Sequence, residues 1–146
     1  MIEVRNITKK FGKLLVLDKI SFKVDNSEFV SIIGPSGCGK STLLRTILGF
    51  EKLDDGKIII DGEEVKGISN KLGFVFQEHN LFPWRTISEN ISFGLENKGI
   101  DKSEIKKIVD TTIKLVGLEG FDDKYPYQLS GGMRQRAALA RVLAFN

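Results

Sequence analysis

The chain has 146 residues, of which 41% are hydrophobic, which is enough for one modest domain with a hydrophobic core. Its 22 basic and 19 acidic residues give a net charge of +3, too mild and too scattered to indicate nucleic-acid binding. The single cysteine excludes an internal disulfide, and no apolar run approaches the length of a membrane span, so we expect any membrane role to come through a partner.

Two segments near the N-terminus predict half-buried β-strands. Residues 2–7 and 20–24 alternate apolar and polar side chains, as a strand with one buried face does. Residues 9–13 lie between them and predict a basic turn that carries one aromatic side chain, Phe11.

The most specific pattern of the chain follows. It comprises Gly34, Pro35, Ser36, Gly37, Cys38, Gly39, Lys40, Ser41 and Thr42. The apolar, β-branched run 29–33 before it predicts a buried strand, and residues 43–48 after it predict a helix that Gly49 ends. A strand, a glycine-rich loop, Gly-Lys-Ser and a helix together form the context of a phosphate-binding P-loop.

These residue types suit a nucleoside triphosphate with Mg²⁺. Glycines let successive backbone N–H groups face one anion, and the new helix adds its positive end. Lys40 would place a charge at the β- and γ-phosphates, and the Ser41 hydroxyl is a suitable Mg²⁺ ligand. The competing interpretation, a glycine-rich turn with an incidental lysine, is disfavoured by the flanking elements. Phe11 either packs in a core or stacks on a nucleobase.

The middle of the chain predicts more β-structure. Residues 53–65 place an apolar run between two turns rich in Asp and Gly, which predicts an antiparallel hairpin. Residues 58–61 also resemble a strand followed by a Mg²⁺-binding aspartate, but the hairpin turns argue against that role. A further buried strand, 71–77, ends at Gln77, and we expect His79 in the next loop to be solvated.

Helices dominate the rest. Thr86 and Glu89 predict a capping box for a helix that runs to about residue 97. Residues 101–116 predict an amphipathic helix capped by Asp101, with this buried face: Ile105, Ile108, Val109, Thr112, Leu115 and Val116. The last helix, 133–145, is apolar almost all round, so we expect it to be mostly buried.

The P-loop, Gln77 and the segment Leu-Ser-Gly-Gly-Met-Arg-Gln-Arg at 129–136 stand in the order and at the separations of ABC-type ATPases, which the whole chain resembles. The resemblance implies an α/β fold: a P-loop NTPase core with a small antiparallel β subdomain, and a helical subdomain with the signature motif. We expect residues 1–146 to form a single partial domain, with the core in 1–85 and the helical subdomain in 86–146.

The resemblance also implies roles for individual residues, with ATP and Mg²⁺ as cofactors. Phe11 matches the aromatic that stacks on adenine, residues 34–42 match the Walker A segment, and Gln77 matches the glutamine that contacts Mg²⁺ and the attacking water. Ser130, Gly131 and Gly132 belong to the signature, which caps the γ-phosphate of ATP bound to a second subunit. A complete site would therefore need a head-to-tail dimer.

Residues 77–84 and the following segment 86–90 resemble the nitrate, sulfonate and taurine importer branch, as does the Met-Arg-Gln-Arg form of the signature. This predicts an ATPase subunit that couples ATP hydrolysis to the import of a small solute. It would lie in the cytoplasm, on the inner face of the membrane, through a transmembrane permease, without nucleic acid. The alternatives are a soluble ABC ATPase without a membrane partner, and a nucleotide-binding fragment without turnover.

In the family the signature helix leads to a strand that ends in Asp-Glu, the Walker B strand, and then to a histidine. Here no acidic residue follows Asp123. We therefore expect the 146 residues to be C-terminally incomplete and inactive in ATP hydrolysis, since phosphoryl transfer depends on positioned charge. We also expect the isolated chain to fold poorly, because 29–33 would lack a parallel neighbour. A cooperative thermal transition of the purified monomer would contradict this expectation.

Overall fold

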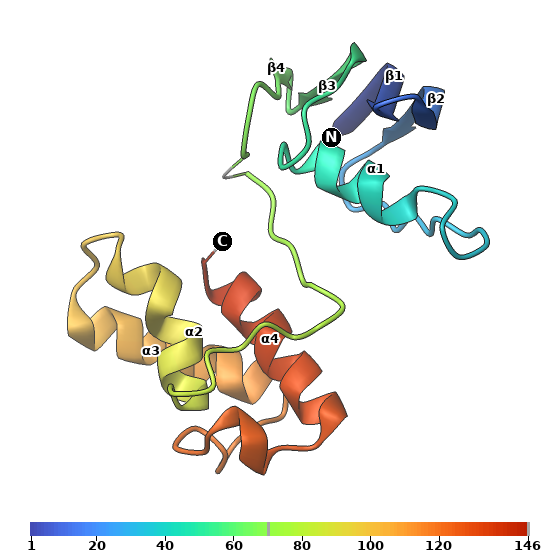
Figure 1. Cartoon of the computed structure of the whole chain (residues 1–146). Helices are drawn as coiled ribbons and strands as arrows, with labels where there is room; N and C mark the ends of the chain where they lie inside the picture. Colours follow the sequence, from blue (N-terminus) through green and yellow to red (C-terminus); the bar gives the residue numbers. More distant parts are fainter. Residues whose placement is uncertain (70, 146) are drawn as a thin grey trace. The chain divides into compact units, whose positions relative to one another are not determined.

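A computed structural model describes residues 1–69 and 71–145, and it confirms a mixed α/β architecture (Figure 1). The chain forms two compact units, Met1–Leu72 and a second that begins at Gly73. This division comes earlier than the one after residue 85 expected from the sequence. The reason is that the loop before residue 86 packs with the helices: Leu81 lies against their core, and the Asn80 carbonyl accepts a hydrogen bond from Arg141 (2.8 Å).

The first unit contains an antiparallel sheet in the order β2-β1-β3-β4. Its strands are β1 (Ile2–Phe11), β2 (Leu14–Val24), β3 (Asp55–Ile60) and β4 (Glu63–Glu64). The predicted basic turn is shorter than expected: β1 runs to Phe11 and β2 begins at Leu14, so only Gly12, with a positive φ of 59°, and Lys13 form the turn. The predicted hairpin is present, and Asp61 in its turn pairs with the Met1 ammonium at 2.5 Å.

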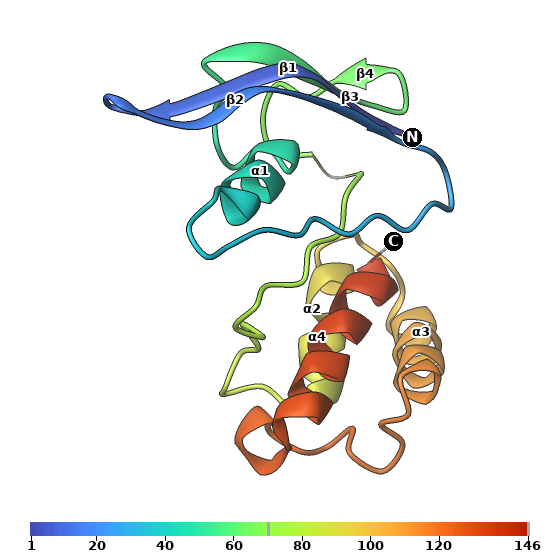
Figure 2. The ribbon, with the colours of Figure 1, turned by 90° about the vertical axis from the view of Figure 1, so that its right-hand side faces the viewer.

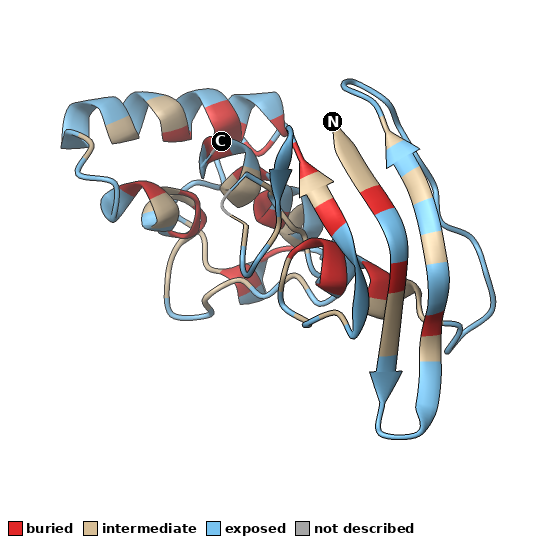
Figure 3. Cartoon of the chain, turned by 90° about the horizontal axis from the view of Figure 1, so that it is seen from above, coloured by how far each residue is buried: buried red, intermediate tan, exposed pale blue. Residues whose placement is uncertain are grey.

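Helix α1 (Lys40–Ile47) covers one face of this sheet (Figure 2). Buried residues recur along β1 and β3, as Figure 3 shows, and they form one core with Leu43 and Ile47 of the helix. The resulting core consists of Val4, Ile7, Leu17, Leu43, Ile47, Ile58 and Ile60. Packing of α1 on this core fixes where the helix begins, and so fixes the end of the glycine-rich loop.

The two predicted buried strands at 29–33 and 71–77 are not strands in the structure. Among the described residues neither segment has a ladder partner, and the side chains of Phe29 and Ile33 are 92% and 93% exposed. A parallel strand is stable only between neighbours that satisfy its backbone groups and cover both faces. The apolar composition of these segments therefore does not suffice to form a sheet within residues 1–69 and 71–145.

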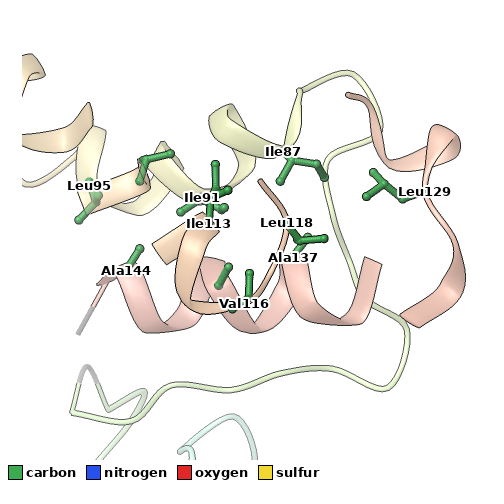
Figure 4. Close-up of a cluster of buried hydrophobic side chains, with 11 residues drawn as sticks. Ile87, Ile91, Leu95, Ile113, Val116, Leu118, Leu129, Ala137 and Ala144 are labelled. Atoms are coloured by element: carbon green, nitrogen blue, oxygen red, sulfur yellow. The ribbon is translucent and has the colours of Figure 1, made fainter. Parts of the chain in front are cut away.

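The second unit is built from α2 (Ile87–Glu96), α3 (Lys102–Leu115), the short 3₁₀ helix η1 (Pro126–Gln128) and α4 (Gly131–Phe145). Their shared core, drawn in Figure 4, is aliphatic. It consists of Ile87, Ile91, Leu95, Val109, Ile113, Val116, Leu118, Leu129, Ala137, Ala140 and Ala144. No helix of the described residues has both the length and the apolar character that crossing a bilayer requires.

Three details of the predicted helices are wrong. Leu115 is 72% exposed and Ile113 is buried instead, because Ile113 lies one helical turn beyond Val109 and Leu115 does not. Asp101 occupies the N-cap of α3 but makes no cap bond, and its carboxylate accepts from the Ser103 hydroxyl (2.7 Å). Helix α4 buries only its alanine face, leaving Leu139 and Leu143 exposed.

The capping box of α2 gives a direct test of the fold. The Thr86 hydroxyl accepts from the Glu89 N–H (3.2 Å), and the Glu89 carboxylate accepts from the Thr86 N–H (2.7 Å). We expect Thr86→Ala to lower the free energy of unfolding of the whole gene product by about 1 kcal/mol, measured by urea denaturation. The control Thr111→Ala, at an exposed position of α3, should cause no loss. Equal effects of the two substitutions would contradict the assigned cap.

Candidate nucleotide-binding site

The candidate phosphate-binding loop spans residues 34–39 and leads directly into α1. Gly37 and Gly39 have φ angles of 81° and 96°, a region that residues with side chains rarely adopt. A Cβ on Gly39 would lie 3.1 Å from Val16 Cγ1, and one on Gly34 would lie 2.8 Å from Cys38 Sγ. Gly37 and Gly39 are thus favoured by the conformation of the loop, and Gly39 also by its close approach to β2.

Helix α1 begins without a side-chain cap. Its N-cap residue is Gly39, and the first backbone hydrogen bond runs from the Leu43 N–H to the Gly39 carbonyl (2.8 Å). The N–H groups of the first turn have no helical carbonyl before them, and the helix dipole makes this end positive. The exposed Ser41 lies in this turn. The start of α1 therefore has the donors that an anion needs.

Lys40 is held by the loop itself. Its ammonium donates to the carbonyls of Gly34 (2.8 Å) and Pro35 (2.7 Å), and it lies 3.7 Å from Cys38 Sγ. It is the only basic residue within 34–42. A phosphate would offer charged oxygens in place of neutral carbonyls, and charge-assisted hydrogen bonds are the stronger kind. The loop residues therefore fit a phosphate tail and keep the lysine beside it.

Phe11 lies at the end of β1, opposite Leu14 across the hairpin. Its side chain is 47% exposed, so it is not a core residue, and Lys9 Nζ lies 5.0 Å from its ring centroid. This exposure argues against the packing interpretation of Phe11. Stacking on a nucleobase remains a proposal.

Gln77 and His79 belong to the second unit, whereas Phe11 and the P-loop belong to the first. Gln77 is exposed, as a side chain that meets a ligand must be. The expectation for His79 is wrong: this residue is half-buried, and its Nδ1 is buried without a hydrogen-bond partner among the described residues. Its loop packs on the helices, which the residue types around it do not signal.

The signature segment begins α4. The Ser130 hydroxyl accepts from the Met133 N–H (3.3 Å) and so caps the helix. Gly131 and Gly132 are exposed, and a Cβ on Gly132 would meet nothing within 4 Å. The first two residues of α4 therefore leave its backbone uncovered by side chains of their own.

Two arginines of the signature serve the fold in a way that the sequence reasoning missed. Arg134 donates to the Leu129 carbonyl (2.6 Å), and Arg136 donates to the carbonyls of Val116 (2.7 Å) and Gly117 (2.8 Å) at the end of α3. Cations are favoured at helix C-termini, which explains why Arg136 lies at the end of α3. A hollow of about 350 Å³ lies beside Gly132 and Arg136.

A glycine loop, an uncapped helix start and a lysine within reach define a P-loop nucleotide-binding protein. A family model described as ABC transporter matches residues 17–146. Because the match covers most of the sequence, the chain belongs to the ABC transporter family.

Sequence relatives from the same family also match the chain. The chain is 52% identical over 147 residues to an uncharacterized ABC transporter ATP-binding protein of Methanocaldococcus jannaschii, covering 98% of this chain and 55% of the relative. It is 49% identical to the aliphatic sulfonates import ATP-binding protein SsuB of Bacillus cereus, and the match covers 93% of this chain and 53% of that relative. It is 45% identical to the Fe(3+) ions import ATP-binding protein FbpC of Escherichia coli O157:H7, and the match covers 97% of this chain and 42% of that relative. The chain thus spans about half the length of these relatives.

A dimeric structure of an ATP-binding cassette in a post-hydrolysis state, bound to ADP and Pi, is similar with a TM-score of 0.87 and 36% identity. The similarity covers 100% of this chain and 70% of that structure. The predicted ABC ATPase fold is therefore confirmed.

We expect Lys40→Ala to weaken ATP binding at least tenfold, since hydrogen bonds to charged groups are worth about 1.5–3 kcal/mol. Titration of a fluorescent ATP analogue measures the change. Lys57→Ala is the matched control, because Lys57 is an exposed lysine on β3. Unchanged affinity in Lys40→Ala would refute the P-loop assignment.

Proposed function

We propose that this chain is part of the ATP-binding subunit of an ABC importer, which couples ATP binding and hydrolysis to the import of a small solute. The observation that carries the proposal is the uncapped start of α1 with Lys40 beside it. The phosphates would bind the first-turn N–H groups and Lys40, and Phe11 would stack on adenine. Ser41 and Gln77 would hold Mg²⁺, which neutralises phosphate charge.

Ser130, Gly131 and Gly132 would bind the γ-phosphate of ATP held by a second copy, in a head-to-tail dimer. Their exposure supports this role, because neither glycine is covered by the chain's own fold. The similar solved cassette is dimeric and bound to ADP and Pi, which also supports it.

The partner that delivers the solute would be a transmembrane permease, which holds this subunit on the cytoplasmic face of the membrane. Residues 80–85, here named the aromatic loop, present the contact surface. The Phe82 ring centroid lies 5.6 Å from that of Trp84, and the Trp84 side chain is 71% exposed. Aromatic anchors of this kind carry binding energy at interfaces. Relatives named for import support the proposal, and a sulfonate-like solute fits the branch resemblance.

A second candidate is nucleotide binding without turnover by residues 1–146. It rests on the same phosphate-binding loop and differs from the first candidate in the absence of hydrolysis. A soluble ABC ATPase without a permease is the third candidate, which the exposed aromatic loop disfavours.

One experiment separates these candidates. The whole gene product is purified with and without a candidate permease in lipid nanodiscs, and its ATP hydrolysis is measured. An importer subunit should bind the permease and hydrolyse ATP faster in its presence. Hydrolysis without permease binding would favour a soluble ATPase, and ATP binding without hydrolysis would favour a binding module.

A further inference from the structure

The aromatic loop is held by one buried amide. Asn90 on α2 is fully buried, and its side chain faces the backbone of the loop. Its Oδ1 accepts from the Phe82 N–H (2.8 Å), and its Nδ2 donates to the Phe82 carbonyl (3.1 Å). A single side chain thus pairs with both backbone groups of one residue, as a neighbouring strand would.

The same amide reaches two further carbonyls, those of Arg85 (3.0 Å) and Thr86 (2.9 Å). A primary amide has two N–H donors, so these are shared among three acceptors. If the amide were flipped, its oxygen would face three carbonyl oxygens with no proton between them. The positions of Oδ1 and Nδ2 follow from this. Every polar atom of Asn90 is therefore used to shape residues 82–86.

The turn that Asn90 holds is the one that displays Trp84. The Arg85 N–H donates to the Phe82 carbonyl (3.2 Å), closing a turn with Pro83 at its second position, where proline is favoured. The ring of Phe82 packs 4.6 Å from that of Phe93 on α2, centroid to centroid. Trp84 is 71% exposed and its ring centroid lies 5.6 Å from that of Phe82, so its placement depends on the turn that holds both residues.

The outer side of the loop is fixed by charge. The Arg85 guanidinium donates to both carboxylate oxygens of Glu96 (3.1 Å each) and lies 4.9 Å from the Phe93 ring centroid. The Ser92 hydroxyl, and then Arg85, hold the pKa of the Glu96 carboxyl below its usual value. This pair is solvent-exposed, so it contributes less than the buried amide does.

We infer that Asn90 is a positioning residue for the permease contact, because it fixes the turn that presents Trp84. The inference rests on the proposed function. Because Asn90 is fully buried, it would act on the permease only through the loop that it holds. Without its two donors, the Arg85 carbonyl loses its bond to Asn90, and the carbonyls of Phe82 and Thr86 each keep only one backbone donor. The turn is then held by fewer bonds and loses its single conformation. Permease binding would then weaken while ATP binding stays unchanged.

The test uses the whole gene product labelled with 5-fluorotryptophan, with the Trp84 resonance assigned by its loss in Trp84→Phe. Asn90→Asp is nearly isosteric and keeps the acceptor but removes both donors. Asn97→Asp is the matched control, because it makes the same chemical change at an exposed position adjoining the same helix. Thr86→Ala controls for loss of stability in α2.

We expect a single sharp fluorine resonance in the unsubstituted protein and in both controls, and a shifted or split one in Asn90→Asp. We expect affinity for the permease in nanodiscs to fall about tenfold in Asn90→Asp alone, the scale of losing one aromatic anchor. An unchanged resonance, or a changed resonance with unchanged permease affinity, overturns the inference.

Two further outcomes are decisive. If Asn90→Asp does not fold, hydrogen exchange of the unsubstituted protein replaces it: slow exchange of the Phe82 N–H supports the inference, and fast exchange overturns it. If the unsubstituted protein binds no permease, the proposed function fails and the role of Asn90 at the contact fails with it. The fluorine resonance then reports separately that Asn90 still shapes the turn.

Discussion

The start of α1 is the constraint on which the site depends. A helix normally begins with a side chain that satisfies its first N–H groups, but here the N-cap is Gly39, which has none to offer. Packing of α1 against the sheet holds that end in place, and glycines at positive φ bring the loop back over it. The first-turn N–H groups, which no side chain caps, and Lys40 beside them are what the proposed phosphate binding rests on.

The second unit uses the same physics differently. Its glycine-rich segment also precedes a helix, but the Ser130 hydroxyl caps that helix, and arginines tie the segment to α3. The result is an exposed pair of glycines at the start of a capped helix, in contrast to the uncapped start of α1. Such a pair suits a ligand that is held mainly by another chain, which agrees with the proposed head-to-tail dimer.

Local signals in the sequence predicted much of this. The capping box at Thr86, the hairpins and the glycine loop were found because each depends on neighbours in the chain. The segments 29–33 and 71–77 were misjudged because a parallel strand depends on partners that sequence composition cannot supply. Asn90 was passed over because a buried amide has meaning only once the backbone it contacts is known. The exposure of Leu139 was missed because apolar composition does not reveal which helix face is covered.

Phosphate binding at the start of α1 is tested most directly by titrating the ¹⁵N-labelled whole gene product with Mg-ATP and following the backbone N–H resonances of residues 37–41. We expect these resonances to shift together and saturate, because their N–H groups would bind the phosphates. Unchanged resonances at saturating Mg-ATP would contradict phosphate binding there.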